Sequence, residues 1–211
     1  MQKKIVLMLL ITVFAVGGAF AQVGMSAGVG GNFGVHMTSY SHPDADFDNP
    51  KPIVGVGFNA FFDATYVMVK AGMFIGGNSE EFDMGNKKQT MNITGTYLSL
   101  GVLGKYPVDM GGFTLFPMLG FEYNMLLSMK MSMGDDSETF KRADQDNASD
   151  SDMLILQLGV GADFNLTDKI YVRPNLLWGI DLNRSKGEKD TKDLRTFKHK
   201  LDFGLAVGFR F

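Results

Sequence analysis

The last thirteen residues of the chain, His199-Lys-Leu-Asp-Phe-Gly-Leu-Ala-Val-Gly-Phe-Arg-Phe211, alternate between large apolar side chains and small or polar ones. Leucine, valine or phenylalanine stands at every odd position from 201 onward. Lysine, aspartate, glycine, alanine or arginine stands at every even position from 200. Successive side chains of a β-strand point to opposite faces, so a period of two predicts a strand with one apolar face.

The same alternation recurs in seven earlier segments, and none of them shows helical periodicity. The segments lie near residues 23–38, 52–63, 66–77, 92–106, 113–131, 154–164 and 170–183. Glycines gather on the face opposite the apolar one, as at Gly28, Gly30, Gly55 and Gly57. Glycine weakens a strand, so its concentration on one face needs a spatial reason. A narrow barrel supplies that reason, because the side chains of all its strands converge inside it. We therefore predict an all-β fold with a small polar interior.

The connections between these segments alternate in length. Short connections fall at 63–65, 107–112 and 165–168, and long ones at 39–51, 78–91, 132–151 and 185–196. The long connections hold most of the charged residues. Strict alternation is typical of an up-and-down antiparallel barrel with turns at one rim and loops at the other. The prediction is an eight-stranded transmembrane β-barrel with both termini on the side of the short turns.

The apolar faces are predicted to point outward into lipid. A soluble, lipocalin-like barrel would need a charged exterior, and the polar faces here hold mainly glycine, serine, threonine and asparagine. Aromatic residues of the apolar faces also gather near the short turns, as in the girdle at a membrane–water interface. The predicted girdle consists of Phe62, Tyr106, Phe113, Phe164, Phe209 and Phe211.

The first residues predict export from the cytoplasm. Lys3 and Lys4 precede an apolar run over residues 5–16, and Ala19-Phe20-Ala21 follows. This order is typical of a signal peptide, and the run is too short for a transmembrane anchor. We predict cleavage after Ala21, which leaves residues 22–211 as one barrel domain.

Composition excludes several classes of protein. The chain has no cysteine, so it has no disulfide framework and no thiolate metal site. Its net charge of −3 gives no basic footprint for nucleic acid. No cofactor-binding motif is present, and we expect no cofactor, no catalytic residues and no metal.

Ionisable residues on the polar faces form the main candidate site. Because both signs occur, we expect a packed network of ion pairs in the lumen, which an eight-stranded barrel is narrow enough to form. The alternative is a narrow gated channel. The predicted lumen residues are Lys70, Glu122, Asp163, Arg173, Asp181, Lys200, Asp202 and Arg210.

The export signal, the rhythm of strands and loops, and the ending Leu201–Phe211 together resemble the eight-stranded outer-membrane β-barrel proteins of the OmpA and OmpX type. Unlike full-length OmpA, the chain is expected to have no second, peptidoglycan-binding domain. The resemblance implies a location in the outer membrane of a didermal bacterium, surrounded by its lipid. It also implies that the terminal Phe211 is the signal read by the barrel-assembly machinery.

The predicted role is that of a non-enzymatic, monomeric surface protein. Its four long connections would face outward and contact the environment or host ligands in adhesion. The first alternative is a narrow pore or conduit for small hydrophobic molecules, as in OmpW-like barrels. The second is an enzyme at the outer rim, for which His36 and His199 fall near the required level.

Overall fold

The computed structural model describes residues 24–41, 50–84, 87–134, 136–144, 152–183 and 195–211. The predicted signal peptide and parts of all four long connections lie outside these ranges. Within them the chain forms strands and one short 3₁₀-helix, and no helix there is long and apolar enough to cross a membrane. The elements are β1 (Met25–Ser41), β2 (Ile53–Ala64), β3 (Val67–Met84), β4 (Lys87–Lys105), β5 (Val108–Asp109), β6 (Phe113–Met133), β7 (Asp136–Lys141), η1 (Arg142–Asp144), β8 (Met153–Asn165), β9 (Ile170–Asp181) and β10 (Arg195–Arg210).

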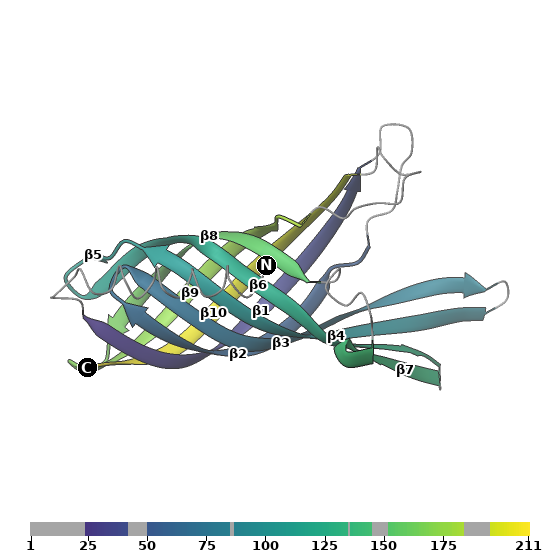
Figure 1. Ribbon diagram of the computed structural model, residues 1–211, viewed down its shortest axis with the longest axis horizontal. Coiled ribbons are helices and arrows are strands. Elements are labelled where there is room, and N and C mark those ends of the chain that lie inside the picture. The colour runs from purple at the N-terminus through teal and green to yellow at the C-terminus, as the bar shows by residue number, and fades with distance from the viewer. Residues whose placement is uncertain (1–23, 42–49, 85–86, 135, 145–151, 184–194) are drawn as a thin grey trace.

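The eight long strands close into an antiparallel barrel, which confirms the predicted fold (Figure 1). Each strand pairs with its neighbours in sequence, and β1 pairs with β10 to close the ring. The short β5 and β7 lie outside this ring and pair with β6 alone. Closure satisfies the backbone hydrogen bonds along the span, which hydrocarbon requires.

The predicted apolar faces point outward. On β10, Leu201, Phe203, Leu205 and Phe209 are all exposed, whereas Asp202 between them is buried. The other long strands repeat this pattern, with exposed side chains such as those of Val56, Phe58, Leu158 and Leu176. A belt of leucine, valine and phenylalanine on the outer surface suits contact with lipid and not with water.

The interior is less polar than predicted. Phe61, Phe74, Phe116 and Tyr171 point into the lumen and are buried there. The prediction assigns one set of alternating apolar positions on each strand to the outer face. Where two consecutive residues are both apolar, as at Phe61-Phe62, one of them points into the lumen. The glycines of neighbouring strands make room for these rings. A Cβ on Gly208, for example, would overlap Cζ of Tyr171.

The long connections are shorter than predicted because strands continue into them. Most of the segment 78–91, predicted as a loop, belongs to strands: residues 78–84 and 87–91 continue the pairing of β3 with β4 as far as Met84 and Lys87. Strand β1 likewise extends into the predicted connection 39–51 and pairs with the start of β10. Part of the connection 132–151 is β7, which folds back on β6. The barrel therefore carries paired strands beyond its outer end (Figure 1).

Candidate functional site

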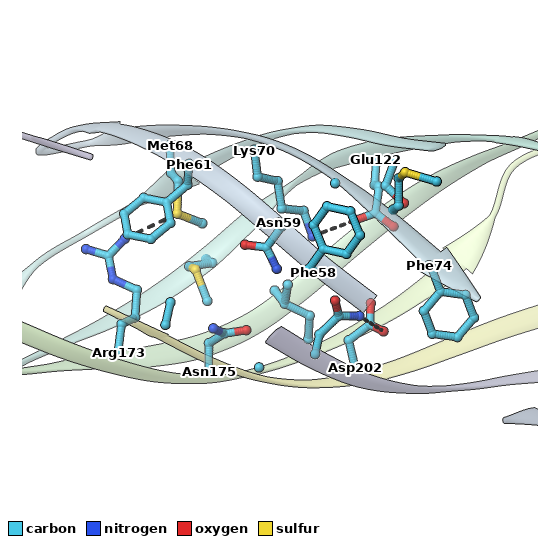
Figure 2. A pocket seen from close by; sticks show the side chains of 18 of the residues that line it. Phe58, Asn59, Phe61, Met68, Lys70, Phe74, Glu122, Arg173, Asn175 and Asp202 are labelled. Carbon is cyan, nitrogen blue, oxygen red and sulfur yellow. Dashed lines mark hydrogen bonds and ion pairs between the residues drawn. The ribbon is translucent and has the colours of Figure 1, made fainter. Parts of the chain in front are cut away.

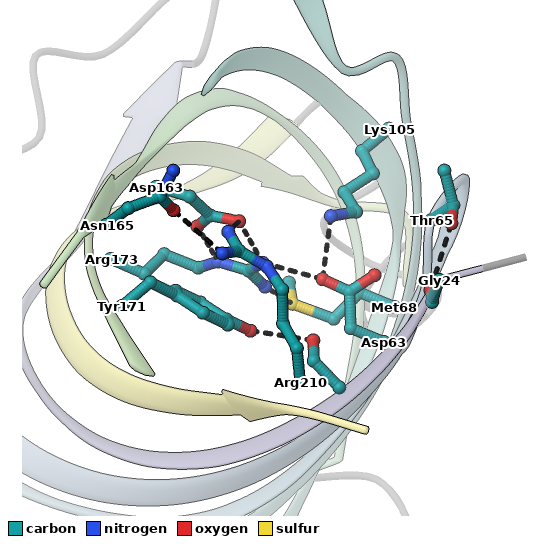
Figure 3. Close-up of polar contacts among 11 residues, drawn as sticks. Gly24, Asp63, Thr65, Met68, Lys105, Asp163, Asn165, Tyr171, Arg173 and Arg210 are labelled. Carbon is teal, nitrogen blue, oxygen red and sulfur yellow. Dashed lines mark hydrogen bonds and ion pairs between the residues drawn. The ribbon is translucent and has the colours of Figure 1, made fainter. Parts of the chain in front are cut away.

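A first ionic cluster, near the short-turn end of the lumen, is built around Arg173 of β9 (Figure 3). Its guanidinium donates to both oxygens of Asp163, at 2.6 Å from Nε and 2.8 Å from Nη2. Nη2 also lies 2.7 Å from Oδ2 of Asp63, and Nζ of Lys105 lies 2.7 Å from the same oxygen. These two contacts with Asp63 are close ion pairs and not aligned hydrogen bonds. Both carboxylates are thereby neutralised inside the barrel.

Aromatic rings enclose the Arg173 guanidinium. Its Cζ lies 4.8 Å from the ring centre of Phe61, 4.9 Å from that of Phe116 and 5.0 Å from that of Tyr171. A planar guanidinium stacks well on such faces, and the rings exclude water from the ion pairs. The hydroxyl groups of Tyr171 and Ser26 form a hydrogen bond of 2.7 Å beside the cluster. The short-turn half of the lumen is filled by side chains.

A second ionic cluster lies farther from the short turns and is built around Glu122 of β6 (Figure 2). Glu122 is 1% exposed and forms ion pairs with Lys70 of β3 and Lys200 of β10. Lys200 also lies 2.8 Å from Oδ2 of Asp202, whose other oxygen accepts a 3.4 Å hydrogen bond from Asn32. Two lysines thus face two carboxylates, and the cluster carries no net charge.

The space between the two clusters is a cavity of about 50 Å³. Both Arg173 and Glu122 line it, together with apolar side chains such as Met118 and Leu177. A cavity of this size holds a few water molecules and no larger solute. The two clusters lie one behind the other along the barrel. A solute that crosses the lumen would therefore have to pass both of them.

The structure brings most of the predicted lumen residues together. Lys70, Glu122, Lys200 and Asp202 share the second cluster. Asp163 and Arg173 share the first, and Arg210 lies beside it with Nη2 at 3.9 Å from Asp163. Asp181 stands apart, nearer the outer end, where Oδ1 accepts a 3.0 Å hydrogen bond from the N–H of Asn183.

Two members of the first cluster, Asp63 and Lys105, are absent from the predicted lumen residues. Asp63 begins the predicted short connection 63–65, and Lys105 lies near the end of the predicted strand 92–106. A signal was nevertheless present, because each follows or precedes a residue predicted to face lipid, namely Phe62 and Tyr106. Adjacent residues of a strand face opposite sides, so both charged residues belong on the lumen face.

The predicted girdle residues lie on the outer surface near the short turns. Phe62, Tyr106, Phe164, Phe209 and Phe211 are exposed, and Phe113 is half-buried. Two pairs of rings contact each other there. Phe113 and Phe164 stack with centres 5.2 Å apart, whereas Phe62 and Phe211 are tilted by 42° with centres 6.3 Å apart. Their level suits a membrane interface. The role of Phe211 as an assembly signal stays a prediction.

The outer end of the barrel carries a projecting sheet. Strand β3 leaves β2 after the pair Val54–Gly77 but stays paired with β4 as far as Met84 and Lys87. On the other side, β6 pairs with β4 up to Met133, and β7 takes the place of β8 beside it. At about 3.3 Å per residue, the β3–β4 hairpin extends roughly 20 Å past its last contact with β2. The β1–β10 pair forms a separate projection (Figure 1).

An ion pair fastens β7 and η1 to the barrel. Arg142 of η1 donates to both oxygens of Asp152, at 2.5 and 2.9 Å. Asp152 also accepts hydrogen bonds from the Tyr123 hydroxyl at 2.5 Å and from the N–H of Leu126 at 3.2 Å. Burial disfavours the charged form of Asp152, but the hydrogen bonds from Arg142 and Tyr123 outweigh it and hold the pKa of the carboxyl below its usual value. We call Arg142 and Asp152 the latch.

An apolar outer face, a closed ring of eight strands and a packed ionic lumen together define a small transmembrane β-barrel. The model of the family "outer membrane protein beta-barrel domain" matches residues 6–211, and the chain belongs to this family. It is an outer-membrane protein. No curated protein sequence was found to match it.

Several solved structures are similar in fold. A major outer membrane protein from Thermus thermophilus is 17% identical with a TM-score of 0.50, over 86% of this chain and 99% of that chain. The N-terminal β-barrel domain of OprF from Pseudomonas aeruginosa is 14% identical with a TM-score of 0.41, over 90% and 100%. Ail of Yersinia pestis, the attachment invasion locus protein, is 14% identical with a TM-score of 0.39, over 89% and 99%. At these identities the similarity extends to the fold alone.

Proposed function

We propose that the protein is a non-enzymatic surface barrel that binds extracellular partners through its projecting strands. The observation that carries this proposal is the continuation of β3, β4, β6 and β7 as a paired sheet beyond the barrel. These residues lie past the last contact of β3 with β2, beyond the barrel wall that lipid surrounds. The need to pair backbone groups in lipid therefore does not explain why they form strands. Their pairing presents a surface of defined shape outside the membrane.

The edges of this sheet suit contact with another protein. Among the described residues, β3 beyond Gly77 and β7 each have a strand partner on one side only. An unpaired edge exposes backbone N–H and C=O groups, to which an extended segment of a partner can add as a further strand. Acidic residues mark both edges, including Glu80 and Glu81 on β3 and Asp136 and Glu138 on β7. A partner segment with basic residues would complement them.

The lumen favours this role over that of a conduit. A solute crossing the barrel would have to displace the ion pairs of Glu122 and then those of Arg173, both of which are buried. Breaking a buried ion pair costs about 3–5 kcal/mol. The charges of the two clusters would not stabilise a small hydrophobic molecule as it passes through the lumen.

Trimming the hairpin tests the proposal. Residues 80–91 are replaced by Asn-Gly, which joins Ser79 to Asn92, a directly paired couple, through a two-residue turn. Cells that display the native protein should adhere to at least one of a set of fibronectin-, laminin- and mucin-coated surfaces. The trimmed barrel should lose at least tenfold of that adhesion while remaining folded in the membrane.

A matched control exchanges Gly85-Asn86 for Asn-Gly and keeps the length of the hairpin. This variant should adhere like the native protein. Adhesion no better than that of cells without the protein, or full adhesion by the trimmed variant, would contradict the proposed function.

A further inference from the structure

A second and larger cavity, of about 260 Å³, lies in the outer half of the lumen. The second ionic cluster forms its floor through Lys200. Its walls are mainly apolar and include Tyr97 of β4, Leu126 of β6, and Met153 and Ile155 of β8. These four side chains are buried and pack together with Phe74. The cavity is therefore blocked on the side of the short turns and is distinct from a passage through the barrel.

Three buried polar atoms of residues that line this cavity lack a partner. Within the described part of the chain, Nε2 of His36, Nδ1 of His199 and Oδ2 of Asp181 make no hydrogen bond. The His36 ring is held by Phe74, on which it stacks with centres 4.9 Å apart and planes 13° apart. Nζ of Lys198 lies 3.9 Å from Oδ2 of Asp181, beyond hydrogen-bond length. A buried polar atom without a partner costs free energy, and a bound molecule can remove that cost by supplying the partner.

The charges around the cavity favour an uncharged ligand. Asp181 faces Lys198, and Lys200 in the floor is neutralised by Glu122 and Asp202. A ligand with a net charge would leave that charge uncompensated in a buried site. A hydrogen-bond donor is required, because the free oxygen of Asp181 can only accept.

The size and the lining of the cavity indicate how large the ligand is and what kind of apolar group it carries. An apolar protein cavity of about 150 Å³ binds benzene, so one of 260 Å³ has room for roughly ten non-hydrogen atoms. Tyr97 and the thioethers of Met129 and Met153 favour contact with an aromatic ring. We propose that this cavity binds a small, uncharged aromatic molecule that carries one hydroxyl or N–H donor, directed at Asp181.

Binding can be measured on the full barrel in lipid nanodiscs. The probes are 5-fluoroindole, which has the N–H donor, and 5-fluoro-1-methylindole, which lacks it. Fluorine NMR distinguishes saturable binding to protein from partition into lipid, which is linear and is measured in empty nanodiscs. We expect saturable binding of 5-fluoroindole and about tenfold weaker binding of the methylated probe, a ratio typical of one unmet buried hydrogen bond. In Asp181→Leu this preference should vanish.

Neighbouring residues of β8 provide a matched pair of filling variants. Ile155→Trp places an indole in the cavity and should abolish saturable binding, whereas Leu154→Trp places it on the lipid face and should leave binding unchanged. Met129→Trp fills the cavity from β6 and serves if Ile155→Trp does not fold. The proposal is overturned if the native barrel shows no saturable binding, if a folded filling variant binds as the native protein does, or if Asp181→Leu keeps the full preference for the N–H probe.

Discussion

Single glycines decide how closely the interior aromatic rings approach the barrel wall. A Cβ on Gly28 would overlap the backbone oxygen of Val207 and lie 2.5 Å from Cζ of Phe61, whereas one on Gly31 would lie 3.6 Å from its nearest neighbour. Backbone cannot yield, so we expect Gly28→Ala to lower the free energy of unfolding by about 1–3 kcal/mol. Gly31→Ala, three residues along the same strand, should change it by less than about 1 kcal/mol. Urea unfolding in lipid vesicles measures both, and equal losses would contradict the packing argument.

Glu122 is the residue whose charge matters most to the second cluster. Gln in its place keeps the shape but leaves Lys70 and Lys200 without their shared carboxylate in a buried site. We expect Glu122→Gln to lower the free energy of unfolding by about 3–5 kcal/mol. The same change at the exposed Glu81 is the control and should cost less than about 1 kcal/mol. A loss at Glu122 no greater than at Glu81 would show that the cluster does not stabilise the barrel.

At the scale of elements, the latch holds β7 and η1 against the barrel. Asp152→Asn removes the charge that Arg142 contacts, so the segment should detach and trypsin at pH 8 should cleave after Arg142 at least tenfold faster. Glu138→Gln, an exposed change on β7 itself, is the control and should leave the cleavage rate unchanged. Equal rates in native protein and Asp152→Asn would mean that strand pairing alone holds the segment.

The latch should also respond to acid. Because the pKa of Asp152 is lowered in the folded protein, its stabilising effect is fully present above the ordinary value of 3.8 and is lost as the pH falls below it. Hydrogen exchange of the β7 amides, corrected for the intrinsic rate, should therefore be protected at pH 5 and lose protection progressively as the pH is lowered below 3.8. In Asp152→Asn the protection should be low at both pH values.

Strands in lipid were predictable from sequence, and strands beyond it were not. The period of two in 199–211 follows from lipid on one side and a lumen on the other, so it placed Lys200 and Asp202 on the inner face. Residues 78–91 have no lipid face and hence no such period, and their charge content indicated a loop. Only Gly85-Asn86, a two-residue hairpin signal, pointed to continued pairing. Partners within the lumen were also beyond prediction, because the contact of Glu122 with Lys200 depends on the register of strands far apart in sequence.

For the whole molecule, the two ionic clusters act as barriers in series. An ion that crosses the barrel must pass both, so removing one should leave the other closed. We expect negligible single-channel current in planar bilayers for the native protein, for Glu122→Ala and for Arg173→Ala. Measurable current should require both substitutions together, since each alanine opens space at one level only. Comparable current in the native barrel would show that the clusters part readily and would restore the channel interpretation, whereas current in one single variant would identify that cluster as the sole barrier.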